Sequence, residues 1–337
     1  MFYVKIKTIL IHCQNIRQYS KPINKFKPPW NILFFGTDNF SLPTLQALNY
    51  RYAQNDIISK LEVVTTTKNK PNVIYQFASK EKLKIHSWPI NAMNGFHIGL
   101  VVSFGYLIPQ SIINSFPLGM LNVHASLLPR WRGAAPIIHA IANGDGTTGI
   151  TIMTVKPKHF DVGNIVRQES VAITDDMVLP ELYKLLADIG SSVLIDELYK
   201  LPENIYSAKS QPHIGITLAP KVTIAFSHIN WNTMTAIQIY NLSRALHDLF
   251  PLRTKWGDIV LKLYNIKLCT TENTNNKSIQ PGMMYYDKIT KFLKIQCCDG
   301  NWISVATVGI PNKRMMSASD FNNGFLKKAE QEKRILT

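Results

Sequence analysis

The sequence predicts an α/β protein in which a doubly wound, mostly parallel sheet is followed by a smaller, OB-like β-barrel. At 337 residues, the chain is long enough for two hydrophobic cores. Over residues 31–198, short apolar runs alternate with helical patterns, which is typical of parallel strands joined by crossover helices. The last third has one helical pattern and then several short apolar runs, as small barrels do. We expect a first domain over residues 29–205, a linker over residues 206–225 and a second domain over residues 226–333.

The first domain is expected to begin with a buried strand over residues 31–37, NILFFGT, followed by a glycine turn and a helix over residues 42–48. The turn lacks the GxGxxG spacing, so a dinucleotide site is not predicted. The other expected strands are residues 61–65, 83–86, 98–104, 118–123 and 149–155, and the other expected helices are residues 72–80, 109–113 and 179–198 and one that begins near Gly133.

The second domain follows a proline-containing segment, residues 201–221, whose weak periodicity indicates a linker. A helix is expected over residues 233–247. Short strands are expected over residues 259–268, 282–286, 292–297 and 302–308. Small barrels of the OB type often bind nucleic acid.

The net charge of +15 is distributed unevenly along the chain. Residues 29–220 carry fifteen basic and fourteen acidic side chains, whereas residues 221–337 carry sixteen basic and eight acidic ones. A nearly neutral first domain suits small-molecule chemistry, and a basic second domain suits a polyanion. The alternative is charge that serves solubility alone.

Residues 1–28 carry six Lys and Arg among apolar residues and no acidic residue. This composition favours an amphipathic mitochondrial transit peptide, and hence a protein of the mitochondrial matrix. The motif that begins at Arg17 resembles a presequence-processing site with its cut after Tyr19. A disordered basic tail is the alternative, but the folded pattern begins only at Asn31.

Asn122 and His124 end the apolar run of residues 118–123, and they alternate with Val123. On a strand, both side chains would therefore point to the same side. The carboxyl ends of strands in open α/β sheets are where ligands bind. An amide donor beside an imidazole suits a site that holds a carbonyl oxygen as it gains negative charge. On this pair alone, hydrogen-bonded residues at a strand end would be the preferred interpretation.

The run NVHASLLPRWRGAAPI, residues 122–137, closely resembles the methionyl-tRNA formyltransferase family, and the resemblance covers most of residues 31–325. The segment FDVGNIV, residues 160–166, resembles the D-x-G-x-I/M segment of that family. The resemblance makes Asp161 the third catalytic residue beside Asn122 and His124, although alone it would be a turn residue. It also implies that the tetrahydrofolate-binding loop is formed by Ser126, Leu127, Leu128 and Pro129.

The resemblance implies transfer of the formyl group of a co-substrate, 10-formyltetrahydrofolate, to the α-amine of initiator methionyl-tRNA in mitochondrial translation. It implies a formyltransferase catalytic domain, a C-terminal tRNA-binding domain and no metal. There are two alternatives. One is a folate-dependent formyltransferase or hydrolase that acts on another amine acceptor, and the other is a non-catalytic tRNA-binding relative. The basic second domain favours tRNA, because a small acceptor does not need such a surface.

Several further expectations concern loops and partners. Bacterial members carry a longer basic insertion where this chain has only TTKNKP, residues 66–71, so the contacts of that loop do not carry over. Arg130 and Arg132 would either bind carboxylate or phosphate or be solvated. The four cysteines lack metal-ligand spacing, so neither a zinc site nor a disulfide framework is expected. No apolar stretch is long enough for a membrane span, and we expect a monomer without a membrane partner.

Overall fold

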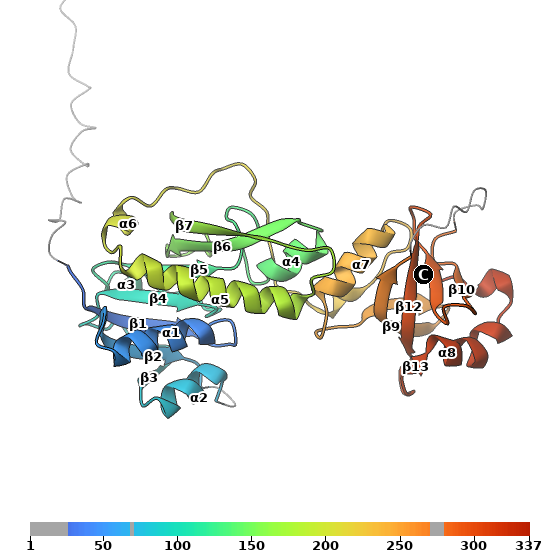
Figure 1. Cartoon of the computed structure of the whole chain (residues 1–337), viewed down its shortest axis with the longest axis horizontal. Coiled ribbons are helices and arrows are strands. Elements are labelled where there is room, and N and C mark those ends of the chain that lie inside the picture. The colour runs from blue at the N-terminus through green and yellow to red at the C-terminus, as the bar shows by residue number, and fades with distance from the viewer. Residues whose placement is uncertain (1–25, 68–70, 270–279) are drawn as a thin grey trace, which may run out of the picture.

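The computed structural model describes residues 26–67, 71–269 and 280–337, which form two units connected end to end (Figure 1). The first unit contains a seven-stranded sheet and the second a six-stranded sheet. Most of the predicted transit peptide, its expected cut after Tyr19, and Lys68 and Lys70 of the short basic loop lie outside the described residues.

The sheet of the first unit has the strand order β3-β2-β1-β4-β5-β6-β7. Its strands are β1 (Trp30–Gly36), β2 (Ile58–Thr65), β3 (Lys84–Ser87), β4 (Ile98–Val102), β5 (Met120–His124), β6 (Thr147–Thr154) and β7 (Ile165–Ala172). Strands β1 to β5 are parallel, and β6 pairs antiparallel with both of its neighbours, β5 and β7. The predicted doubly wound, mostly parallel sheet is confirmed. Strand β7 was not predicted, because four consecutive polar residues occupy the middle of this edge strand.

Both faces of this sheet are covered, which explains the unbroken apolar run in β1. Ile32 and Phe34 belong to the core on one face, whereas Leu33 and Phe35 belong to the core on the other. The first core also contains residues of α1 (Leu42–Ala53), α2 (Val73–Lys80), α4 (Pro136–Ala142) and α5 (Leu179–Leu198). The second contains residues of α3 (Gln110–Ile113). The sheet can therefore display ligand-binding residues only at its edges and strand ends.

The second unit is an antiparallel, barrel-like sheet with α7 (Ala236–Ala245) packed against it. The strand order is β10-β11-β12-β9-β8, with β13 paired to β12. These strands are β8 (Leu252–Trp256), β9 (Ile259–Leu268), β10 (Met284–Tyr286), β11 (Leu293–Gln296), β12 (Trp302–Gly309) and β13 (Met316–Ser317). The remaining helices of the chain are α6 (Glu203–Tyr206), α8 (Ala318–Gly324), η1 (Ile224–Ser227), η2 (Leu326–Lys328) and η3 (Gln331–Lys333). The predicted smaller barrel domain is confirmed, although β8 and α8 were not expected.

The C-terminal residues connect the two edge strands of this sheet. Lys255 at the β8 edge exchanges two backbone hydrogen bonds of 2.9 Å with Thr337. Leu336 donates from its backbone N–H to the carbonyl of Gly282, just before β10, at 2.9 Å, and its side chain is buried. Residues 334–337, which follow the predicted end of the domain at residue 333, thus bridge the gap between β8 and β10 and complete the barrel.

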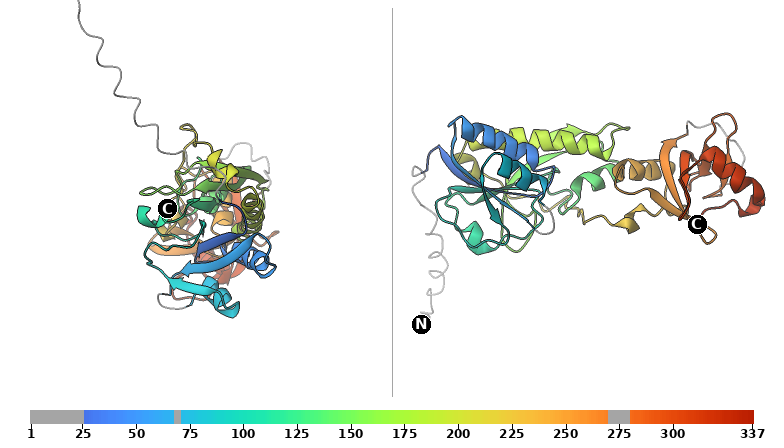
Figure 2. Two further views of the ribbon diagram at one scale, coloured as in Figure 1. Left: turned by 90° about the vertical axis from the view of Figure 1, so that its left-hand side faces the viewer. Right: turned by 90° about the horizontal axis from the view of Figure 1, so that it is seen from below.

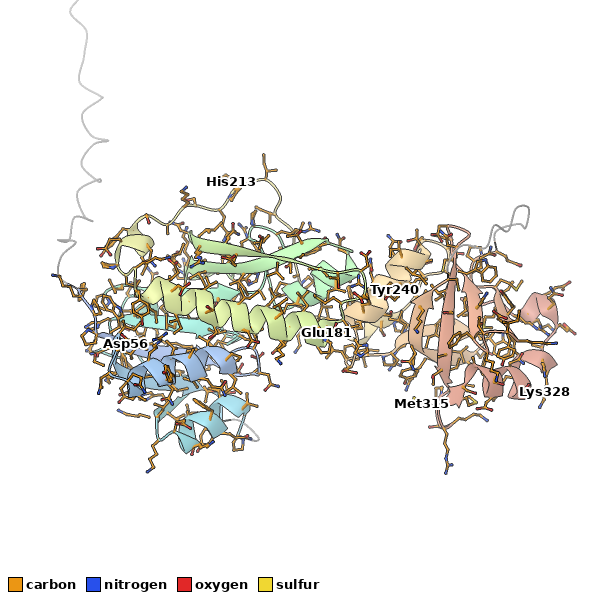
Figure 3. The ribbon with its side chains drawn as sticks, in the orientation of Figure 1. Asp56, Glu181, His213, Tyr240, Met315 and Lys328 are labelled. Carbon is orange, nitrogen blue, oxygen red and sulfur yellow. The ribbon has the colours of Figure 1, made fainter. Side chains whose placement is uncertain are left out.

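The two units are held together by α7 and by the segment predicted as a linker. Buried Arg244 on α7 donates to the carbonyl oxygens of Thr174 at 3.2 Å and Met177 at 2.7 Å in the first unit. In the linker, Lys209 pairs with Ile165 of β7, so this segment runs along the first unit as a hydrogen-bonded strap. Figure 2 shows the resulting elongated molecule, and Figure 3 marks Glu181 and Tyr240 on either side of the junction. Within the described ranges, no helix is both long and apolar enough to cross a membrane.

Candidate active site

A cavity of about 670 Å³ lies at the carboxyl ends of β1, β4 and β5. This is where the strand order reverses, between β1 and β4, and ligands bind at such points in open α/β sheets. Its lining includes Asp38 after β1, residues 103–108 after β4, and the end of β5. His247, Asp248 and Leu249, which follow α7, also line it. Both units therefore contribute to one cavity.

The structure brings Asn122, His124 and Asp161 to this cavity. Asn122 and His124 come from the end of β5, and Asp161 comes from the loop between β6 and β7. The side chains of His124 and Asp161 are largely buried, and His124 Nδ1 lies 3.5 Å from Asp161 Oδ1. His124 Nε2 lies 2.9 Å from the carbonyl oxygen of Trp131. Because a carbonyl oxygen only accepts hydrogen bonds, Nε2 carries a proton and Nδ1 faces the carboxylate.

Asp161 is held in place by groups that are distant in sequence. The backbone N–H of Gly133 donates to Asp161 Oδ2 at 2.9 Å. The buried side chain of Gln211, on the strap, donates to the carbonyl oxygens of Asp161 and Gly163, each at 2.9 Å. A Cβ at Gly163 would lie 1.5 Å from the carbonyl oxygen of Thr154, so only glycine fits there. This close approach is the physical reason for the D-x-G spacing.

The predicted folate loop is not part of the cavity lining. Ser126 is fully buried, and its hydroxyl donates to the carbonyl oxygen of Arg130 at 2.6 Å. Leu128 is also buried, and its backbone N–H donates to Thr151 Oγ1 at 3.1 Å. Leu127 and Pro129 are half-buried. These four residues belong to the turn that carries Trp131 to His124, and their folate-binding role stays a prediction.

The two arginines beside that loop are both hydrogen-bonded within the protein. Arg130 makes two hydrogen bonds to Asp145, at 2.7 and 2.6 Å, and these raise the pKa of the guanidinium. Arg132 donates from two nitrogens to Gln211 Oε1, at 3.0 and 2.5 Å. Arg132 therefore orients the same Gln211 that holds Asp161.

Sequence reasoning missed a polar group at the opposite end of the cavity. Asp38 follows β1, and the hydroxyl of Ser103, which follows β4, donates to its carboxylate. Burial raises the pKa of Asp38, although this hydrogen bond opposes the shift. Burial also raises the pKa of Tyr183, which lines the cavity from α5. The rule that identified Asn122, a polar residue at the carboxyl end of a strand, would have identified Asp38 as well.

Aromatic side chains line the part of the cavity that follows β4. Phe104 and Tyr106 both line it, with ring centroids 5.3 Å apart. Trp88 packs edge-on against Phe104 at 5.1 Å. Such a cluster suits a flat aromatic ligand. Across the part of the chain that the structure describes, no group of three or more His, Cys, Asp or Glu could hold a metal ion.

Both units match models of known protein families. The Formyl transferase model matches residues 89–198, and the model of the formyl transferase C-terminal domain matches residues 221–326. The fold is similar to that of WlaRD, a sugar 3N-formyl transferase, with a TM-score of 0.61 at 20% identity, covering 86% of this chain and 100% of that one. The protein is thus an enzyme of the formyltransferase class.

Sequence relatives define its family within that class. Mitochondrial methionyl-tRNA formyltransferase of Bos taurus is 40% identical over 309 residues, which is 89% of this chain and 78% of the relative. Methionyl-tRNA formyltransferase of Fusobacterium nucleatum is 30% identical over 320 residues, which is 89% of this chain and 99% of the relative. The chain belongs to the methionyl-tRNA formyltransferase family, and the resemblance stated from the sequence is confirmed.

Proposed function

We propose that this enzyme transfers the formyl group of 10-formyltetrahydrofolate to the α-amine of initiator methionyl-tRNA. The observation that carries the proposal is the convergence of Asn122, His124 and Asp161 on one cavity in a member of this family. An amide donor, an imidazole and a carboxylate are the groups that acyl transfer between two nitrogens requires.

In the proposed reaction, the amine nitrogen bonds to the formyl carbon and forms a tetrahedral intermediate. Asn122 donates its amide N–H to the formyl oxygen as that oxygen becomes negative. The imidazole of His124, paired through Nδ1 with Asp161, helps to stabilise that charge. Asp161 orients the imidazole and helps to move one proton, through water, from the amine to the folate N10. Breakage of the bond between the formyl carbon and N10 then releases tetrahydrofolate and formylmethionyl-tRNA.

We assign the folate to the part of the cavity that Phe104 and Tyr106 line. Their rings offer a surface for a pterin, and Asp38 and Ser103 supply polar groups nearby. WlaRD, the sugar formyltransferase of similar fold, was crystallised in the presence of dTDP and 5-N-formyl-THF, which supports a folate co-substrate here. The loop of residues 126–129 is the folate-binding loop that the family resemblance implies, and hydrogen bonds within the protein fix its shape.

We assign the tRNA body to the basic second unit. We also propose that the first domain spans residues 29–205 and the second domain spans residues 226–333. Lys313 and Arg314 lie in an exposed loop after β12. Neither forms an ion pair among the described residues, so both can contact phosphate. We further propose a monomer in the mitochondrial matrix that acts in translation initiation, with residues 1–28 as the transit peptide. The mitochondrial relatives and the basic leader support that location.

The proposal is tested by offering the purified enzyme labelled 10-formyltetrahydrofolate with three acceptors: charged initiator methionyl-tRNA, the same tRNA uncharged, and an amino-sugar nucleotide. We expect label only on the charged tRNA, since the α-amine exists only there. Formylation of the sugar with none on methionyl-tRNA would overturn the assigned acceptor. Tight tRNA binding without any formyl transfer would instead favour a non-catalytic tRNA-binding relative.

A further inference from the structure

One aromatic side chain on the cavity wall is exposed and has no packing role. Phe160 is 54% exposed, lines the cavity, and belongs to none of the hydrophobic cores. No other aromatic ring of the described residues pairs with it, whereas Tyr106 on the same cavity contacts two rings. Exposing a phenyl ring to water is unfavourable, so a ligand that covers Phe160 would gain apolar burial.

Three basic residues shortly precede this ring in the sequence. Lys156, Lys158 and His159 are exposed, and none of them forms an ion pair within the described ranges. By contrast, Arg130 and Arg167 in the same domain are both paired with carboxylates. An exposed ring beside unpaired cations is the combination that single-stranded nucleic acid recognises, because bases stack on the ring while phosphates meet the charges.

We propose that Phe160 is the stacking platform for the 3′-terminal base of the acceptor tRNA, with Lys156, Lys158 and His159 as contacts to the adjoining phosphates. The proposal rests on the proposed function and specifies how its acceptor is held. Phe160 directly precedes Asp161, and consecutive Cα atoms are about 3.8 Å apart. A short ester connects the α-amine of methionine to the terminal ribose. An amine placed at Asp161 therefore brings the terminal base to the neighbourhood of Phe160.

The test is a double-mutant cycle in which the Phe160 side chain and the terminal adenosine of the tRNA are removed singly and together. The affinity of wild type and of Phe160→Ala is measured for uncharged tRNA with an intact 3′ end and for the same tRNA without its terminal adenosine. Removal of one stacking interaction predicts that Phe160→Ala binds intact tRNA about 5- to 100-fold more weakly. The two proteins should bind the shortened tRNA equally, and Phe160→Tyr should retain the affinity of wild type.

The matched control is Tyr206→Ala, which removes an aromatic ring of similar exposure that lies outside the cavity, and it should leave both affinities unchanged. Equal weakening of both tRNAs by Phe160→Ala would overturn the proposal. So would an unchanged tRNA affinity together with a raised KM for 10-formyltetrahydrofolate, since the ring would then face the folate. The cycle measures binding alone, so an absence of formyl transfer by wild type would contradict the proposed function separately.

Discussion

Asp161 occupies the left-handed region of backbone conformation, with a φ of +57°. Aspartate tolerates this region better than most side chains do, but the conformation still requires support from neighbouring groups. Gln211 provides that support through two donated hydrogen bonds, and Arg132 fixes the amide of Gln211 in turn. Gln211 is therefore a positioning residue that acts through Asp161.

We expect Gln211→Leu to lower kcat by about 10- to 100-fold, because a small displacement of a catalytic group has an effect of that size. The KM for methionyl-tRNA should change little, since Gln211 is buried and does not line the cavity. Steady-state kinetics with Gln76→Leu, an exposed change on α2, as control would check this. A raised KM with normal kcat would contradict the positioning role.

Asp145 gives a pH-dependent prediction. Burial alone would raise its pKa, but hydrogen bonds from Arg130, Trp131 and Asn143 hold the pKa below its usual value. Because the pKa is depressed in the folded state, the stabilisation is complete above about pH 4 and is lost as the pH falls below it. Asp145→Asn should therefore reduce the free energy of unfolding by about 1–3 kcal/mol at neutral pH, and less in acid.

Urea unfolding of wild type and Asp145→Asn between pH 3 and pH 7 would measure this difference. Asp188→Asn, an exposed change on α5, is the control and should have little effect at any pH. A difference between wild type and Asp145→Asn that grows as the pH falls would show that the assigned sign is wrong.

For single residues, the sequence predicted site residues where their position follows from the local secondary structure. Asn122 and His124 could be assigned because an apolar strand ends at them, and the site lies at strand ends. Asp161 required the family resemblance, because its contact with Gly133 joins residues 28 positions apart. Gln211 was missed, because its partners are 48 to 79 residues away and its own surroundings indicated only a linker.

At the scale of elements, most of the strands that the sequence predicted are buried on both faces or clearly alternating, with the exposed edge strand β3 as an exception. The exposed edge strand β7 was missed, because its polar residues obscure the period of two. The folate-binding role of residues 126–129 rests on the family resemblance, because an apolar motif in a tight turn indicates packing as readily as binding. The closure of the barrel was not predictable either, since residues 334–337 show no strand pattern of their own.

Barrel closure leads to a stability prediction. Leu336 is 2% exposed, so Leu336→Ala should lower the free energy of unfolding by about 2–4 kcal/mol. Chemical unfolding would measure the loss, with Ile289→Ala, which changes a 92% exposed side chain in the same unit, as control. Equal stability of Leu336→Ala and wild type would mean that the C-terminal residues do not complete the core.

At the scale of the whole molecule, the cavity depends on both units, because His247, Asp248 and Leu249 line it beside the proposed catalytic residues. The buried guanidinium of Arg244 fixes α7 to the first unit and so sets the position of that loop. Charge is divided between the units, and the second unit carries the excess of basic residues. The composition predicted this division, whereas the shared cavity became visible only in the structure.

The exposed loop of Lys313 and Arg314 tests the role of that charge. Replacing both with Ala should weaken tRNA binding. The slope of the logarithm of the binding constant against the logarithm of salt concentration should become shallower by about 0.7–0.9 for each phosphate that is no longer neutralised. Affinities measured over a range of salt concentrations would show this. Replacing Lys80 and Lys184, exposed on the first unit, is the matched control. An unchanged salt dependence would place the tRNA body elsewhere.

The central claim is that Asn122, His124 and Asp161 transfer a formyl group to methionyl-tRNA. Its most direct test is the single-turnover rate of formylation by wild type and by Asn122→Ala, His124→Ala and Asp161→Ala, with tRNA affinity measured in parallel. Loss of a donor to a developing oxyanion predicts a rate about 10²- to 10³-fold lower for Asn122→Ala, with tRNA affinity retained. Comparable losses are expected for the other two variants. Rates at the level of wild type in Asn122→Ala and His124→Ala would contradict the account.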